Sequence, residues 1–186
     1  MANYDISYKI LMKREFYNNP DYFVHKNKGE SMLTVAGLYQ KWNPKAVDWS
    51  FIERVISICQ DDLKMASRLL IRDKKLQSQI YLAFKEKYWN KNRLSEILNQ
   101  NTANEIFISA TNIGNENAVK LAQKVVNVKQ DGILGSNTLK ALNEFDHVVF
   151  DIMFDKEEIT NYKKIARMNP NLSHNLKGWI NRSVSV

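Results

Sequence analysis

The sequence predicts an all-α fold, and three observations support this prediction. Apolar residues recur every three or four positions along most of the 186-residue chain, which is the period of a helix with one buried face. Alternation of apolar and polar residues, which marks a half-buried strand, never lasts more than a few positions. The chain has only 6 Gly and 3 Pro, fewer than the tight turns of a β-sandwich or barrel require. We expect a compact domain of about eight to ten short helices.

The first helix is predicted for residues 3–18, where Tyr4, Tyr8 and Leu11 share one face. Residues 18–31, NNPDYFVHKNKGES, are mostly polar and show no clear period. We therefore expect a long loop or a short two-stranded excursion there, and long ordered loops in compact domains are often functional.

Capping and turn residues punctuate the rest of the chain. Residues 34–42 are predicted to form a short helix that Asn43-Pro44 ends, because the residue before a proline avoids helical backbone. Asp48 is expected to be the N-cap of the next helix. A tight turn is expected at Gln130-Asp131-Gly132, and Asn169-Pro170 should separate the last two helices. The later helices, predicted from apolar spacing, cover residues 49–59, 63–70, 76–88, 103–110, 115–126, 137–145, 159–165 and 172–180.

The charge balance favours polyanionic partners. The net charge is +7 and the pI is near 9.4, which suits nucleic acid, anionic lipid or the acidic polymers of a bacterial wall. The basic residues are spread along the chain, so a solvated basic surface is the alternative. No apolar stretch approaches the roughly 18 residues of a membrane-spanning helix, and the N-terminus lacks the pattern of a signal peptide. We expect a soluble protein made in the cytoplasm.

The cysteine and histidine content excludes several kinds of site. Cys59 is the only cysteine, which rules out an internal disulfide and a zinc site built from several thiolates. It shares a helical stripe with Trp49 and Ile56, so a buried core thiol is expected. The three histidines are far apart in the sequence, and no metal site is predicted.

Glu15 occupies a position where the first helix should present an apolar residue. It lies four residues after Leu11, on the stripe that Tyr4 and Tyr8 begin. A carboxyl group on an aromatic face loses hydration, which favours its protonated form. A protonated glutamic acid can donate a proton to a leaving group. Glu15 is therefore a candidate general acid, and the alternative is a frayed helix end with Glu15 in water.

Four sequence stretches follow the motif order of one family. KREFYNNPDY resembles an H-E-G-G-Y-x-N-x-P stretch, and FKEKYWNKNRLSEI with FISATNIGNENAVKLAQK resembles a Y-W-D segment leading to a helix that ends in N-x-G. VKQDGILGSNTLKAL resembles D-G-x-x-G-x-x-T-x-x-A-L, and LKGWINR resembles G-W-x-x-R. From about residue 10 to residue 182 the chain thus resembles glycoside hydrolase family 108, the lysozyme-like proteins of phages and bacteria that close with a predicted peptidoglycan domain.

This resemblance implies a fold, a domain division and a reaction. The fold would be a compact, lysozyme-like set of helices with a small loop or short hairpin after the first helix. Residues 1–100 would form the catalytic segment and residues 101–186 the peptidoglycan-domain segment, packed together as one globular unit. The reaction would be cleavage of the β-1,4 bond between N-acetylmuramic acid and N-acetylglucosamine of bacterial peptidoglycan, with Glu15 as the catalytic acid and no cofactor.

A second group must activate water or stabilise charge on the sugar. The loop carboxylates Glu30 and Asp21 are candidates, and the hydroxyl of Thr34 is a candidate for positioning the water. If no second carboxylate is near, an intramolecular route to an anhydro sugar, as in lytic transglycosylases, is the alternative.

Aromatic rings that stack on sugars and amides that bond N-acetyl groups complete the predicted site. These substrate-binding candidates are Tyr17, Tyr88, Trp89 and Asn112. Trp42 and Trp49, by contrast, lie on apolar stripes and are expected in the core.

Two departures from the family pattern motivate a second hypothesis. Phe16 and Tyr17 stand where the family has glycines after its glutamate. The protein would then be a catalytically degenerate, peptidoglycan-binding or secretion-assisting protein of the same fold. A third hypothesis, a basic helical DNA-binding module, rests on net charge alone, and we expect no nucleic-acid partner.

The expected setting follows from the absence of a signal peptide pattern. We expect a monomer without membrane insertion, made in the cytoplasm and acting at the periplasmic or extracellular cell wall. It would reach the wall after holin-type or other export.

Overall fold

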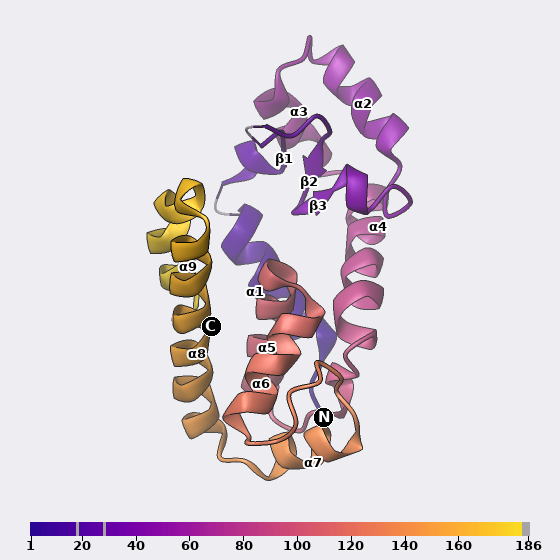
Figure 1. Cartoon of the computed structure of the whole chain (residues 1–186). Coiled ribbons are helices and arrows are strands. Elements are labelled where there is room, and N and C mark those ends of the chain that lie inside the picture. Colours follow the sequence, from indigo (N-terminus) through magenta and orange to yellow (C-terminus); the bar gives the residue numbers. More distant parts are fainter. Residues whose placement is uncertain (18, 28, 184–186) are drawn as a thin grey trace. The chain divides into compact units, whose positions relative to one another are not determined.

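The chain separates into two compact units. The computed structural model describes residues 1–17, 19–27 and 29–183 (Figure 1). One unit is formed by Tyr8–Lys87, and we call it the inserted unit. The other combines Met1–Ser7 with Tyr88–Val186, and we call it the terminal unit. Helices account for most of the described residues and each described strand has two residues, so the all-α prediction is confirmed.

The inserted unit places a small antiparallel sheet among helices (Figure 1). Ser67 on one of these helices holds the first strand, because its hydroxyl donates to the carbonyl of Val24 and accepts from the amide of Val24. The elements are the second half of α1 (Tyr4–Met12), a π-helical turn (Lys13–Tyr17), a 3-10 turn (Pro20–Tyr22), β1 (Val24–His25), β2 (Thr34–Val35), β3 (Leu38–Tyr39), a 3-10 turn (Gln40–Trp42), α2 (Trp49–Ile58), α3 (Leu63–Leu70), α4 (Lys74–Phe84) and the start of a second π-helical segment (Lys85–Asn90).

The helix predicted for residues 34–42 is wrong, because this segment forms a β-hairpin and a 3-10 turn. Thr34 pairs with Tyr39, and the two loop residues between the strands have positive φ angles of 47° at Ala36 and 79° at Gly37. Two consecutive positive φ angles are the backbone of the two-residue hairpin loop whose twist matches that of the strands. The polar residues before it contribute β1, so the short hairpin expected after the first helix becomes a three-stranded sheet.

Capping and burial agree with the sequence at several positions of the inserted unit. The side chain of Asp48 accepts a hydrogen bond of 3.0 Å from the amide of Phe51, so the predicted N-cap is confirmed. Trp49 and Cys59 are buried, as expected of core residues. Trp42 is 71% exposed, so its expected place in the core is wrong.

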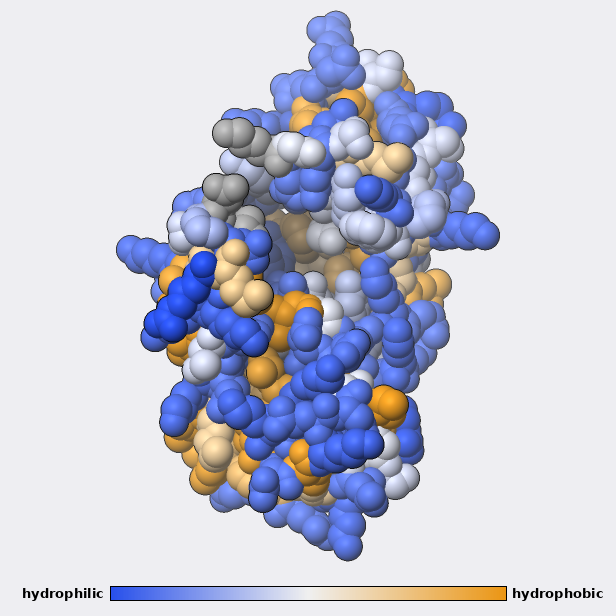
Figure 2. All heavy atoms as spheres, in the orientation of Figure 1, coloured by the Kyte–Doolittle hydropathy of each residue, from blue (hydrophilic) through white to orange (hydrophobic). Residues whose placement is uncertain are grey.

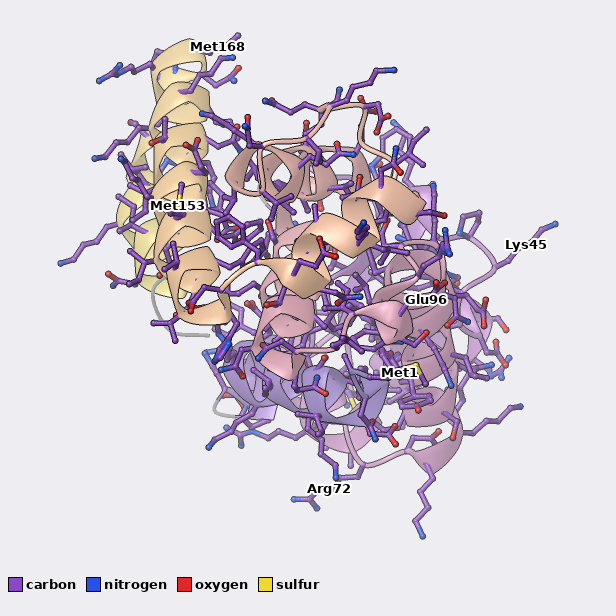
Figure 3. The ribbon with its side chains drawn as sticks, turned by 90° about the horizontal axis from the view of Figure 1, so that it is seen from below. Met1, Lys45, Arg72, Glu96, Met153 and Met168 are labelled. Carbon is purple, nitrogen blue, oxygen red and sulfur yellow. The ribbon has the colours of Figure 1, made fainter. Side chains whose placement is uncertain are left out.

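The terminal unit is built around a buried central helix. Helix α5 (Gln100–Ile113) is buried at every position from Thr102 to Ala110, and α6 (Asn115–Val125) and α8 (His147–Met168) pack on it. The helix predicted for residues 159–165 is the later part of the longer α8, along which the labelled Met153 and Met168 lie in Figure 3. The described elements are a 3-10 turn (Leu94–Glu96), α5 (Gln100–Ile113), α6 (Asn115–Val125), α7 (Ser136–Glu144), α8 (His147–Met168), a 3-10 segment (Pro170–Asn175) and α9 (Leu176–Ser183).

The boundary between the units differs from the predicted division at residues 100 and 101. The amide of Ala2 donates to the carbonyl of Ile97, and the ring of Tyr4 packs on Trp89 and Phe107. These contacts join the first residues, and the segment that begins at Tyr88, to α5. The chain therefore divides between Ser7 and Tyr8 and again between Lys87 and Tyr88, and the packing of the two predicted segments as one globular unit stays a prediction.

A buried carboxyl group lies between α5 and α8 of the terminal unit. Glu105 is 2% exposed. Its burial, reinforced by nearby Asp155, Asp151 and Glu158 on α8, raises the pKa of Glu105 to about 10. The Glu105 carboxyl is therefore protonated at neutral pH and shares a hydrogen bond with Asp151.

The predicted Asp131-Gly132 turn is held by a buried amide. The side chain of Gln123 donates to Asp131 Oδ1 at 2.8 Å and accepts from the amide of Gly132 at 2.9 Å. Gly132 has a φ of 76°, and a Cβ atom there would lie 2.6 Å from the Cγ atom of Glu116. The turn therefore requires glycine for its backbone angle and for its close approach to α6.

Gly132→Ala is expected to lower the free energy of unfolding by about 2 kcal/mol, because it adds backbone strain and a steric clash. Gly135→Ala is the matched control, since no atom lies within 4 Å of its added Cβ and its φ is not positive. Chemical denaturation of both variants measures the difference. Equal stability of the two would contradict this account of the turn.

Among the helices that the structure describes, none is long and apolar enough to cross a membrane. The described residues also contain no cluster of three or more histidine, cysteine or acidic side chains placed to hold a metal ion.

Candidate functional site

Glu15 lies in a π-helical turn that changes the register of the first helix. In α1 the inward positions include Leu11 and Met12, which are buried. An α-helix would bring Glu15 onto that face, but each π-helical turn contains one extra residue. The inward position passes to Phe16, which is 6% exposed, and Glu15 is half-buried at the edge of the core. Such π-helical turns occur frequently at functional sites.

Phe16 joins the Glu15 turn to the sheet of the inserted unit. Its ring meets that of Phe23 edge to face, with ring centroids 6.0 Å apart. Its far end also lies below the hairpin loop, 3.8 Å from where a Cβ atom of Gly37 would stand. The aromatic residue that replaces a glycine of the family pattern is thus a core residue, and it packs the turn that carries Glu15 against the hairpin that carries Thr34.

Thr34 has a buried hydroxyl without a hydrogen-bond partner among the described residues. The residue is 4% exposed, and its Oγ1 atom accepts and donates nothing there. An unsatisfied buried hydroxyl costs free energy, so native proteins keep few of them without a reason such as a bound water or a role in a site. This placement agrees with the sequence prediction that the Thr34 hydroxyl positions a water molecule, which stays a prediction.

Thr34→Val is expected to raise the free energy of unfolding by about 1 kcal/mol, because it removes an unsatisfied buried polar atom from a side chain of nearly the same shape. Thr138→Val is the matched control: the Thr138 hydroxyl accepts a hydrogen bond of 3.1 Å from Gln123, so its loss should be destabilising. Urea denaturation compares the two variants. A destabilised Thr34→Val variant would show that the hydroxyl is satisfied in solution.

The two loop carboxylates have different partners. Both oxygens of Asp21 accept from the guanidinium of Arg68, at 2.6 and 3.0 Å, and this ion pair lowers the pKa of Asp21. Asp21 is therefore an ionised, geometrically fixed group, which makes it a poor catalytic base. Glu30 accepts a hydrogen bond of 2.9 Å from the side chain of Asn27, and it remains a predicted candidate for the second catalytic group.

The predicted substrate-binding residues are divided between the units. Tyr17 lies in the inserted unit, but its side chain falls outside the described part of the structure. Tyr88 is half-buried in the terminal unit, and burial raises the pKa of its phenol. Asn112 is exposed near the end of α5. Trp89 is 2% exposed and packs between Tyr4 and Phe107, so the prediction that its ring lines a substrate groove is wrong.

The exposed indole of Trp42 is an aromatic surface that the sequence reading missed. Trp42 follows the hairpin on a 3-10 turn, and the ammonium of Lys41 lies 5.3 Å from its ring centroid. Trp42 was expected in the core because its spacing from Leu38 and Tyr39 is that of the buried face of a helix. Its polar neighbours in the sequence, Lys41 and Asn43, are the signal that could have indicated an exposed tryptophan.

The surface seen in Figure 2 is mainly hydrophilic, with small, separate hydrophobic areas. Five ion pairs join described residues, and most involve exposed side chains.

Comparison with known proteins supports a link to peptidoglycan. The family model of the Predicted Peptidoglycan domain matches residues 117–184, less than half of the chain and wholly within the terminal unit. A solved structure of Brucella abortus SagA has a similar fold, with a TM-score of 0.62 at 16% sequence identity, covering 98% of this chain and 94% of that chain. None of the curated proteins matches the sequence. Residues 117–184 are thus similar to the Predicted Peptidoglycan domain, and the chain has the fold of the SagA structure; membership of glycoside hydrolase family 108 does not follow from these findings.

Proposed function

We propose that the protein is a lysozyme-like hydrolase that cleaves the β-1,4 bond between N-acetylmuramic acid and N-acetylglucosamine in peptidoglycan. The observation that carries the proposal is the placement of Glu15. It is a half-buried carboxyl in a π-helical turn, packed through Phe16 against a hairpin with an unsatisfied buried hydroxyl. The family match in the terminal unit supports peptidoglycan as the substrate.

In the proposed reaction Glu15 protonates the glycosidic oxygen as positive charge develops on the sugar ring. Glu15 is half-buried at the edge of the core, so its side chain is partly accessible to a substrate. The Thr34 hydroxyl binds the attacking water only in the complex with substrate, because in the free protein it has hydrogen-bonding capacity that the described residues leave unused. Glu30 is the remaining loop carboxylate for activation of that water.

Two surface features suit the proposed polymer. The exposed ring of Trp42 offers a flat face on which a sugar ring can stack. The net charge of +7 favours contact with an anionic wall polymer. We propose that the protein acts at the periplasmic or extracellular wall after holin-type or other export.

Mass spectrometry of the fragments released from purified peptidoglycan tests the reaction class. A reducing end on N-acetylmuramic acid is the expected product. A reducing end on N-acetylglucosamine, or an anhydro product, would replace the proposed reaction by that of a glucosaminidase or a lytic transglycosylase. Retention on insoluble peptidoglycan without any released fragment would favour the degenerate binding protein.

A further inference from the structure

The inserted unit contains a cavity whose walls share no residue with the proposed catalytic group. Its volume is about 630 Å³, which is within the usual range of small-molecule sites. The walls come from the loop before β2, the 3-10 turn after β3, α2 and the turn between α2 and α3.

The cavity has an apolar floor and a fixed polar wall. Leu33 and Ile56, which line it, are buried. The side chain of Gln40 accepts from the amide of Leu33 at 3.3 Å and donates to Glu53 Oε1 at 3.1 Å. Gln40 therefore ties the loop to α2 and orients the carboxylate of Glu53 at the wall.

The charges around the cavity are mainly negative and form no ion pair with another described residue. Lys26 contributes one positive charge, and Glu53 and Asp61 contribute two negative charges. None of these three side chains takes part in the ion pairs found among the described residues. In a chain with a net charge of +7, this wall has the opposite sign, and a ligand with an ammonium group would complement it.

The backbone brings Asp61 to the cavity at a conformational cost. Gln60 and Asp61 have positive φ angles of 54° and 64° at the end of α2. Glycine is the usual residue in such positions, because a side chain there is strained. The chain places the carboxylate of Asp61 there instead, and this residue lines the cavity.

We propose that this cavity binds the peptide part of peptidoglycan, through the free amine of its diamino acid. This inference rests on the proposed function, because it takes peptidoglycan as the substrate. Wall peptides carry an ammonium group together with carboxylates and short apolar side chains. The ammonium group lies between Glu53 and Asp61, a carboxylate meets Lys26, and the apolar floor receives an alanine methyl group. The neutral glycan lacks the ammonium group that these two carboxylates require.

The probe for this site is the tripeptide L-alanyl-γ-D-glutamyl-meso-diaminopimelate, titrated into the full chain by calorimetry and by amide chemical shifts. Shifts are expected around Gln40, Glu53 and Asp61. The variant Glu53→Gln with Asp61→Asn should bind at least about tenfold more weakly. Gln keeps an oxygen for the bond from Gln40, and Asn tolerates positive φ, so the variant should fold. Acetylation of the free amine of the diaminopimelate residue should weaken binding to the wild-type chain by a similar factor.

Glu144→Gln, which removes an exposed carboxylate from the terminal unit, should bind the tripeptide as the wild type does. Absence of binding, shifts confined to other residues, or unchanged affinity of the double variant would overturn the proposal. The Glu15→Gln variant should bind the tripeptide with the affinity of the wild-type chain. Binding without cleavage of peptidoglycan would therefore contradict only the proposed reaction, and cleavage without binding would contradict only the peptide site.

Discussion

Glu15→Gln is expected to lower the rate at which soluble fragments leave purified peptidoglycan by at least about 100-fold. Glutamine keeps the size and polarity of glutamic acid but cannot transfer a proton, and a positioned general acid contributes about 10²–10⁴ in rate. The measurement is the initial rate of fragment release, with retention on insoluble peptidoglycan recorded in parallel. Binding should persist, because the substitution removes a proton donor and leaves the shape of the site unchanged.

Glu86→Gln is the matched control for this substitution. Glu86 also lies in a π-helical segment, Lys85–Asn90, but it is exposed. Its variant should release fragments at the wild-type rate. Thermal unfolding of both variants separates a loss of chemistry from a loss of fold. Unchanged release by a folded Glu15→Gln variant would remove Glu15 from the reaction and leave the protein as a peptidoglycan binder.

Glu105→Gln is expected to flatten the dependence of stability on pH. The pKa of Glu105 is raised from 4.5 to about 10 in the folded chain, so the folded state binds its proton more tightly than the unfolded state does. Its contribution to stability is fully present below pH 4.5 and is lost as the pH rises toward 10. The slope from this one group approaches about 1.4 kcal/mol per pH unit. Glutamine does not titrate, so the variant should be the more stable protein at pH 9.

Urea denaturation between pH 5 and pH 9 measures this difference, with Glu144→Gln as the control. Glu144 is exposed on α7, and its loss should leave the slope of the wild type nearly unchanged. The nearby carboxylates Asp151, Asp155 and Glu158 all belong to α8, so amide exchange in α5 and α8 should report the same trend. A Glu105→Gln variant with the wild-type slope would mean that Glu105 is hydrated in solution.

The sequence predicted the helical class and several helix boundaries, because the spacing of apolar residues and the capping residues are local signals. Asp48 caps its helix, and Asn169-Pro170 ends α8 as predicted. The hairpin at Thr34 was missed because two-residue strands are too short to show alternation. Its loop signal, positive φ at Ala36 and Gly37, is weakly encoded, since alanine seldom adopts that conformation.

The candidate site was only partly predictable for a related reason. Glu15 stood out because an α-helical period was assumed through residue 18, and the extra residue of a π-helical turn has no local sequence signal. That turn moves Phe16 inward and Glu15 to the edge of the core. Trp89, expected at a substrate groove, is buried, and Trp42, expected in the core, is exposed. Burial of a tryptophan depends on the tertiary packing of its element and not on the residue type.

The division of the chain into two units determines the order in which the units can fold during synthesis on the ribosome. The inserted unit, Tyr8–Lys87, emerges as one continuous stretch. The first seven residues leave the exit tunnel before it, yet their partners, Ile97 and the aromatic rings of Trp89 and Phe107, are translated almost a hundred residues later. Residues 1–7 therefore remain without these partners while the inserted unit is synthesised and folds.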